Sequence, residues 1–304
     1  MDKLIIIAGP TATGKSDAAV ALSKAIGGEV ISADSVQVYR GMDIGSAKIT
    51  PEEMQGVPHH LIDVLDPSEP FNITIFQSMA KEAMKGIYER GHIPVICGGT
   101  GFYIQSILYD IQFTAEETDM TYRTQLEQKP PAELYAMLKE VDPASCDSIH
   151  ENNVKRVIRA LEFYHETGYP ISAHNAKERA RKPAYDARFF VLTDDRAALY
   201  KRIDARVDKM IAAGLVDEVR ALKDRGIPRT STAMQGLGYK EIYDHLAGEC
   251  TLDEAIYTIK RDSRHFAKRQ ITWFKREPDA IWIDRSTFSN PGTDIVSAML
   301  SRLW

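Results

Sequence analysis

The stretch from Leu4 to Ser16, LIIIAGPTATGKS, decides the fold expected for this chain of 304 residues. Its second part matches the pattern G-x-x-x-x-G-K-[ST], with a buried-type strand before it and a helical pattern after it. Glycines let successive backbone N–H groups curl around an oxyanion, while a helix N-terminus and a lysine add positive charge. We therefore predict a diphosphate-binding loop, with the Ser16 hydroxyl as a Mg²⁺ ligand, made of Gly9, Pro10, Thr11, Ala12, Thr13, Gly14, Lys15 and Ser16.

Strand and helix patterns alternate outward from this loop. Further buried-type strands are expected over residues 29–33 and 93–97. Between them, Asn72 is the expected cap of a helix that ends near Arg90, and the second strand leads into a helix around residues 102–109. This alternation predicts an α/β fold with a P-loop-type parallel sheet core flanked by helices.

The pattern changes after residue 112, where helical signals follow one another without strands. A strand returns over 188–193, and the rest of the chain is expected to be helical, with helices starting near residues 239 and 252. We therefore expect a core built from 1–112 and 188–304, with a helical carboxyl-terminal part, interrupted by a mostly helical insertion domain over 113–187.

The composition is that of an ordinary folded protein. With 44% apolar and 27% charged residues, disordered and fibrous classes are excluded. No apolar run approaches the ~18 residues that a membrane span needs. The three cysteines are far apart and lack metal-ligand spacing, which favours a reducing compartment. We expect a cytoplasmic monomer with no membrane partner.

A net charge of −5 argues against a protein that mainly coats nucleic acid. One basic segment stands out, because Lys260–Arg276 holds seven lysines and arginines against Asp262 alone. It can face phosphates, but an ordinary solvated face of an amphipathic helix explains it as well and is favoured by charge alone. Its aromatic residues, Phe266, Trp273 and Phe274, are expected in the core.

The carboxyl ends of parallel strands line the ligand crevice of an α/β sheet. The loop over 9–16, the residues Asp34–Gln37 and the turn Gly98–Gly101 should therefore meet at one pocket. Asp34 is a candidate general base there, and Thr100 would face the transferred group. A purely local role in its own turn explains each side chain equally well. Guanine-nucleotide switches are disfavoured because no N-K-x-D segment follows a strand. The residues by themselves indicate a phosphate-handling transferase that uses Mg²⁺.

Seven segments, in order, sharpen this hypothesis: GPTATGKS, ISADSVQVYRGMDIGSAK, VPHHLIDVLDPSEPFN, VICGGTGFYIQSIL, RVIRALE, MQGLGYKEI and AKRQITWFKR. Together they resemble the tRNA dimethylallyltransferase family, also called tRNA isopentenyltransferase. The resemblance implies transfer of a dimethylallyl group from dimethylallyl diphosphate to N6 of the adenosine 3′-adjacent to the anticodon, with release of diphosphate. The loop, whose motif is typical of nucleotide- and ATP-binding proteins, would then hold a prenyl diphosphate.

The resemblance also implies that the insertion domain over 113–187 binds tRNA, and it implies roles for particular residues. Asp34 would take the proton of the adenine amine, Thr100 would lie beside that amine, and Lys15 would hold the diphosphate. An arginine of the carboxyl half, Arg220 or Arg225, is a candidate for reaching the diphosphate. Contacts with the tRNA anticodon stem-loop are implied for Asp34, Ser35, Val36, Gln37, Thr100, Arg123, Lys155, Arg156, Val157, Ile158 and Arg159.

Several alternatives stay open at this stage. A P-loop small-molecule kinase would suit the loop, and a prenyltransferase acting on free AMP or ADP would need no large basic surface. A non-catalytic RNA-binding module is a third class. Taken without the family resemblance, Arg123, Arg156 and Arg159 are interpreted as ordinary solvated surface residues. The adjacent His59 and His60 are expected to be structural.

Overall fold

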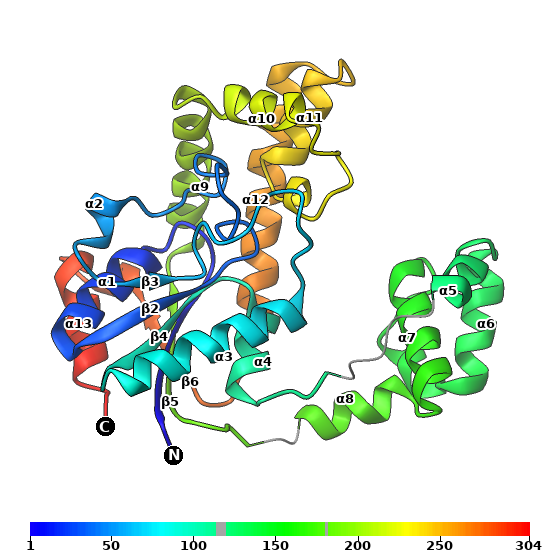
Figure 1. Ribbon diagram of the computed structural model, residues 1–304, viewed down its shortest axis with the longest axis horizontal. Helices are drawn as coiled ribbons and strands as arrows, with labels where there is room; N and C mark the ends of the chain where they lie inside the picture. Colours follow the sequence, from blue (N-terminus) through cyan, green and yellow to red (C-terminus); the bar gives the residue numbers. More distant parts are fainter. Residues whose placement is uncertain (114–119, 180–181) are drawn as a thin grey trace. The chain divides into compact units, whose positions relative to one another are not determined.

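The computed structural model describes residues 1–113, 120–179 and 182–304. Its contacts divide the chain into two units (Figure 1), one made of Met1–Asp110 with Ala184–Trp304 and the other of Ile111–Pro183. The second unit begins two residues before the start of the expected insertion, 113–187, and ends four residues before the end of that insertion. Residues 114–119 and 180–181 of that expected insertion lie outside the described residues.

A parallel sheet forms the centre of the first unit, as the alternating pattern predicts (Figure 1). Its strand order is β3-β2-β4-β1-β5-β6. The strands are β1 (Lys3–Ala8), β2 (Gly28–Ala33), β3 (His59–His60), β4 (Ile93–Gly98), β5 (Asp186–Thr193) and β6 (Ala280–Asp284). Because β2 and β4 lie on one side of β1 and β5 on the other, the chain reverses direction across the sheet beside the Gly9–Ser16 loop.

Two of these strands were not expected from the sequence. β3 has only two residues, too few to show any periodicity. The region that contains β6 was predicted to be wholly helical, which is wrong for Ala280–Asp284. This short edge strand pairs with β5 from Phe189 to Thr193, so docking against β5 decides its conformation.

Alternate residues along the strands build two apolar layers. Ile5 and Ile7 face α1 (Lys15–Ile26) and α13 (Pro291–Leu300). Leu4 and Ile6 face the layer that holds α3 (Ile73–Glu89) and α4 (Gly101–Leu108). The predicted cap of α3 is confirmed, because Asn72 Oδ1 accepts a 3.0 Å hydrogen bond from Ile75 N.

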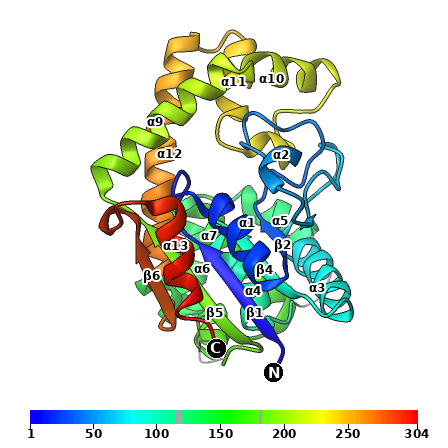
Figure 2. The same ribbon diagram turned by 90° about the vertical axis from the view of Figure 1, so that its left-hand side faces the viewer.

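The remaining helices of this unit follow β5 or lie in short connections. They are α2 (Pro51–Met54), α9 (Arg196–Ala212), α10 (Leu215–Asp224), α11 (Tyr239–Leu246) and α12 (Leu252–Phe274), with 3₁₀ turns at Ala233–Gln235 and Arg285–Thr287. α9 and α12 lie side by side (Figure 2). Two ion pairs of 2.6 Å join them, Lys260 to Asp208 and Arg264 to Asp204. Part of the basic segment is therefore neutralised by a neighbouring helix.

The second unit has its own apolar core. Its elements are α5 (Met120–Glu127), α6 (Pro131–Val141), a 3₁₀ turn (Pro143–Asp147), α7 (Val154–Thr167) and α8 (Ile171–Arg179). The buried carboxylate of Asp142 accepts hydrogen bonds from the backbone N–H groups and hydroxyls of Ser145 and Ser172. Burial opposes its charge, yet these bonds hold the pKa of Asp142 below its usual range.

A buried ion cluster lies on β2. Glu29 is 1% exposed and binds Arg90 through two hydrogen bonds of 2.8 Å. His60 and His92 each contact the same carboxylate at 2.7 Å. The Arg90 hydrogen bonds lower the pKa of Glu29 to about 2, with smaller contributions from both histidines. His60 is thus part of an ion cluster, whereas His59 bonds the Val57 carbonyl and reaches the cavity described below.

The described part of the chain has no helix both long and apolar enough to cross a bilayer. Its three cysteines, Cys97, Cys146 and Cys250, are free thiols. Burial raises the pKa of Cys97 to about 11, so that this thiol stays protonated near neutral pH.

Candidate active site

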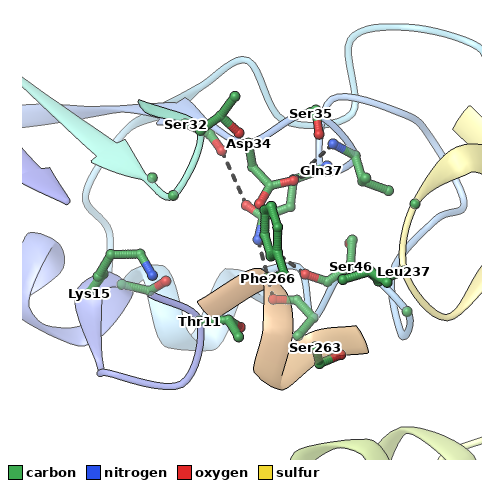
Figure 3. A pocket seen from close by; sticks show the side chains of 18 of the residues that line it. Thr11, Lys15, Ser32, Asp34, Ser35, Gln37, Ser46, Leu237, Ser263 and Phe266 are labelled. Atoms are coloured by element: carbon green, nitrogen blue, oxygen red, sulfur yellow. Dashed lines mark hydrogen bonds between the residues drawn. The ribbon is translucent and has the colours of Figure 1, made fainter. Parts of the chain in front are cut away.

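The loops that follow β1, β2 and β4 line one cavity of about 420 Å³, as the strand-end rule predicts. Figure 3 shows the Lys15 amine and the Asp34 carboxylate directed into this hollow. Helices α9 and α12 supply further walls. The predicted residues that line the cavity are Thr11, Lys15, Ser16, Asp34, Ser35, Val36, Gln37 and Thr100.

The Gly9–Ser16 loop is curled by bonds within itself. Pro10 O accepts hydrogen bonds from Thr13 Oγ1 at 2.8 Å and from Lys15 Nζ at 2.7 Å. Gly14 caps α1 with φ +83°, a conformation that favours glycine, and leaves the first backbone N–H groups of the helix unblocked by any side chain. The loop therefore offers amide donors and one ammonium group to an anion.

The charge of Lys15 is sensitive to its surroundings. Burial is the main cause that lowers the pKa of Lys15 to about 8, and the neighbouring Arg206 acts in the same direction, while Cys97 and the Asp34 carboxylate act in the opposite direction. The residue as a whole is partly exposed and lines the cavity. An anion bound in the loop would restore the ordinary pKa, because it replaces the lost hydration of the ammonium group.

The carboxylate of Asp34 lines the cavity, and one of its two oxygens bonds the backbone of the turn. Oδ1 accepts hydrogen bonds from Val36 N at 2.8 Å and from Gln37 N at 3.2 Å. Within the described residues, Oδ2 has no hydrogen-bond partner. Oδ2 is therefore free to accept a proton in the cavity.

Thr100 stands at the N-cap position of α4, where a threonine side chain usually bonds the helix backbone. Here φ is −88° and ψ is 87°, and the hydroxyl makes no capping hydrogen bond. The side chain lines the cavity instead. The turn-only role considered from the sequence thus does not account for this hydroxyl.

Gln37 is held by its own neighbours. Its Oε1 accepts a hydrogen bond from Ser32 Oγ at 3.2 Å, and its Nε2 donates to Ser46 O and Ala47 O, each at 3.4 Å. These bonds, visible in Figure 3, tie the turn after β2 to the segment 46–47. Both ends of the amide are used within the protein, so an RNA contact by this side chain would have to replace one of these hydrogen bonds.

A carboxylate from α10 anchors the segment that leads away from Gln37. Glu218 accepts hydrogen bonds from the backbone N–H groups of residues 43, 44 and 45 at 2.9, 2.7 and 3.1 Å. The buried Tyr239 hydroxyl also bonds Glu218, at 2.7 Å. A Cβ at Gly45 would lie 2.6 Å from the Tyr239 ring, so only glycine fits there. These contacts join the segments GMDIGSAK and LGYKEI, which lie far apart in the sequence.

Two arginines line the cavity, Arg206 from α9 and Arg269 from α12, and neither was predicted from the sequence to reach the diphosphate. Arg220 bonds Asp217 on the surface and Arg225 bonds Asp66 at 2.8 Å, and neither lines the cavity. Arg206 lines it from α9, where burial lowers its pKa and the Asp34 carboxylate opposes that effect. Helical spacing places Arg206 on the same face as the buried Ile203, three residues earlier, but does not show that this face meets the cavity.

The three aromatic residues of the basic segment do not share one environment. Phe274 is buried in the core and Trp273 packs against it, as expected. Phe266 instead lines the cavity, so its predicted place in the core is wrong. Its position on α12 turns its ring toward the hollow (Figure 3), and the Arg269 guanidinium lies 5.6 Å from the ring centroid.

Comparisons with known proteins agree with this geometry. The family described as IPP transferase matches residues 37–277, and the family described as isopentenyl transferase matches residues 2–66. The tRNA dimethylallyltransferase of Lachnoclostridium phytofermentans is 52% identical over 307 residues, covering 100% of this chain and 98% of that protein. The tRNA dimethylallyltransferase of Carboxydothermus hydrogenoformans is also 52% identical, covering 93% of this chain and 92% of that protein. The chain belongs to the tRNA dimethylallyltransferase family.

Solved structures give the same result for the fold. The tRNA isopentenylpyrophosphate transferase of Bacillus halodurans superposes with a TM-score of 0.75 at 44% identity, covering 99% of this chain and 96% of that one. A eukaryotic dimethylallyltransferase acting on tRNA superposes with a TM-score of 0.85 at 28% identity, covering 99% of this chain and 79% of that one. This family membership makes the protein a prenyltransferase, and neither alternative enzyme activity finds support.

The RNA contacts implied for the second unit divide into two groups. Lys155, Arg156 and Arg159 are exposed on α7. Val157 and Ile158 are buried in the core of that unit, so their side chains present no surface to RNA. Those two predicted contacts are wrong for the side chains, because residues on the apolar stripe of a helix face inward.

Arg123 is tied to its own unit. Its guanidinium bonds Glu127 on the next turn of α5 at 3.0 Å and the buried Glu162 of α7 at 3.3 Å. A buried carboxylate with this cation as a partner stabilises the packing of α5 on α7. An RNA contact by Arg123 would have to share the guanidinium with these carboxylates.

Proposed function

We propose that the protein transfers a dimethylallyl group from dimethylallyl diphosphate to N6 of the adenosine 3′-adjacent to the anticodon of tRNA, and releases diphosphate. The observation that carries the proposal is that Lys15 and the carboxylate of Asp34 open into the same cavity. An anion-binding group and a proton acceptor are thereby available to the two reactants of one substitution.

The donor half of the reaction needs negative charge to be stabilised as the C–O bond to diphosphate breaks. The amides of the Gly9–Ser16 loop and the Lys15 ammonium would hold the diphosphate. Arg206 stands in the same cavity and adds a charge that cannot be lost near neutral pH. Such preorganised donors are most effective where charge develops in the transition state.

The acceptor half needs a proton acceptor. The lone pair of the adenine amine is delocalised into the ring, which makes N6 a weak nucleophile. As the C–N bond forms, Asp34 Oδ2 takes the proton that N6 loses. At the other end of the reacting carbon, the leaving diphosphate carries away the electron pair of the broken C–O bond. The Thr100 hydroxyl lies in the same wall and would orient the amine.

The residues present fit a Mg²⁺ ion that enters with the donor. Within the described residues there is no cluster of three or more His, Cys, Asp or Glu side chains suited to a metal. Mg²⁺ is commonly held by only one or two protein groups together with phosphate oxygens and water. The exposed Ser16 hydroxyl, in the first turn of α1, is the ligand we propose. The ion would neutralise charge on the diphosphate.

The RNA half of the proposal rests on exposed cations. Lys155, Arg156 and Arg159 present their side chains to solvent and can meet the phosphates of the anticodon stem-loop. The acceptor adenine must be unstacked to enter the cavity, which costs a few kcal/mol. We propose that a monomer does this in the cytoplasm, where tRNA is available and three free cysteines stay reduced.

The test is mass spectrometry of tRNA nucleosides after incubation with dimethylallyl diphosphate, Mg²⁺ and unmodified tRNA. A dimethylallyl group on N6 of the adenosine beside the anticodon is the expected product. Parallel reactions replace the tRNA with free AMP or the donor with ATP. A modified AMP with untouched tRNA, or ADP formation, would contradict the proposal.

The affinity for inorganic diphosphate is expected to fall several-fold as the pH rises from about 7.5 to about 9. The pKa of Lys15 is about 8 in the free protein, so its ammonium group is lost over this range and the anion loses a charged partner. Titration calorimetry measures the change. Lys15→Arg is the control, because arginine stays protonated while diphosphate titrates identically; equal pH slopes in both proteins would refute the role of Lys15.

A further inference from the structure

One amide group joins the two halves of the cavity. Gln270 lies on α12, is 6% exposed and lines the cavity wall. Its Oε1 accepts a hydrogen bond of 3.2 Å from Thr11 N, in the diphosphate loop. Its Nε2 donates a hydrogen bond of 3.0 Å to Gly99 O, immediately before Thr100.

Both partners are backbone groups, so the orientation of the amide is determined by chemistry. A backbone N–H can only donate and a carbonyl can only accept, which places Oε1 toward Thr11 and Nε2 toward Gly99. Gln270 therefore ties together two loops that are 259 and 171 residues away from it in sequence.

The turn Gly98–Gly101 packs so closely against α12 that a side chain at Gly99 or Gly101 would not fit. A Cβ at Gly99 would lie 2.2 Å from Gln270 Nε2. A Cβ at Gly101 would lie 2.2 Å from the ring of Trp273, one turn further along α12. Residues three apart share a helix face, so this face of α12 rests directly on the turn that carries Thr100.

The hydrogen bonds of the sheet do not connect these two loops. The pairing of β1 with β4 ends at Ala8 and Gly98, and both loops begin after that point. Beyond the last paired residues, the Gln270 side chain bridges the loop that would hold the leaving group and the turn that would hold the acceptor.

We propose that Gln270 is a positioning residue that sets the spacing between the diphosphate loop and the Thr100 turn. The proposal rests on the function proposed above, since the spacing matters because the carbon and the amine must meet. Reacting atoms need to approach within about 3–3.5 Å, and a misplacement of about 1 Å can cost about 10²-fold in rate.

Gln270→Met removes both hydrogen bonds at similar side-chain volume. We expect kcat to fall by about 10²-fold, with the KM for dimethylallyl diphosphate changed less than about threefold, because the loop amides and Lys15 remain. Gln77→Met is the matched control: Gln77 is 8% exposed, donates a 2.7 Å hydrogen bond to Ser106 O, and lies outside the cavity wall. An equal loss of kcat in both variants, or none in Gln270→Met, would overturn the proposal.

Hydrogen exchange tests the coupling without any substrate, so its result is independent of whether the protein modifies tRNA. In Gln270→Met, amide exchange should become faster in residues 9–16 and in residues 99–103 together, and in neither segment for Gln77→Met. Faster exchange in only one of the two segments would show that Gln270 does not couple them.

Gln270→Glu adds a readout that a purely structural role would not change. A carboxylate repels Gly99 O, whereas a protonated carboxyl group can donate to it and still accept from Thr11 N. The ratio of the kcat of this variant to that of the wild type should therefore rise as the pH falls toward the pKa of the introduced group. A flat ratio would argue against the bridging amide.

Discussion

Replacing Asp34 by asparagine is expected to lower the rate of dimethylallyl transfer by about 10³-fold, within the range of a lost general base. Asparagine keeps an Oδ1 atom, so the hydrogen bonds from Val36 N and Gln37 N, and with them the turn, can persist. What disappears is the basic Oδ2 that would accept the N6 proton. Affinity for tRNA should change less than about threefold, because the role exists mainly in the transition state.

Single-turnover transfer from excess enzyme to labelled tRNA measures the chemical step, and filter binding measures the affinity. Asp284→Asn is the matched control. Asp284 is the last residue of β6, and its Oδ1 accepts a hydrogen bond from a backbone N–H two residues on, Ser286 N at 2.9 Å, but it lies outside the cavity wall. A parallel loss of binding and turnover in Asp34→Asn would remove Asp34 from the role of base.

Arg206→Met is expected to lower kcat by about 10²- to 10³-fold, as for a lost donor to a developing anion. The guanidinium stands in the cavity with Lys15 and interacts with both Lys15 and Asp34. Methionine keeps the aliphatic length against the neighbouring Ile203 and Val207 but cannot balance charge on the departing diphosphate. Inhibition by inorganic diphosphate should weaken in the same variant.

Arg220→Met provides the comparison, because Arg220 lies on the surface beside Asp217, away from the cavity. Steady-state kinetics with saturating tRNA should leave this variant close to the wild type. If the two arginine variants lose activity equally, the loss reflects general electrostatics or folding, and the assignment of Arg206 fails.

The sequence by itself determined the elements that rest on local rules. The strand–loop–helix around Lys15, the cap at Asn72 and the helical stripes all follow from periodicity, capping and turn chemistry, which act over a few residues. The meeting of three loops in one cavity also followed, because parallel strands place their carboxyl ends at one edge. Family membership was evident from motifs spread along the chain.

Tertiary structure alone decided which other side chains reach the cavity. Arg206, Phe266 and Gln270 come from helices whose inward face is set by packing on distant elements, and Glu218 finds its amide partners 173 to 175 residues away. The edge strand β6 likewise forms because β5 offers it backbone partners. Contacts between residues so far apart depend on how whole elements dock, and no local pattern encodes that docking.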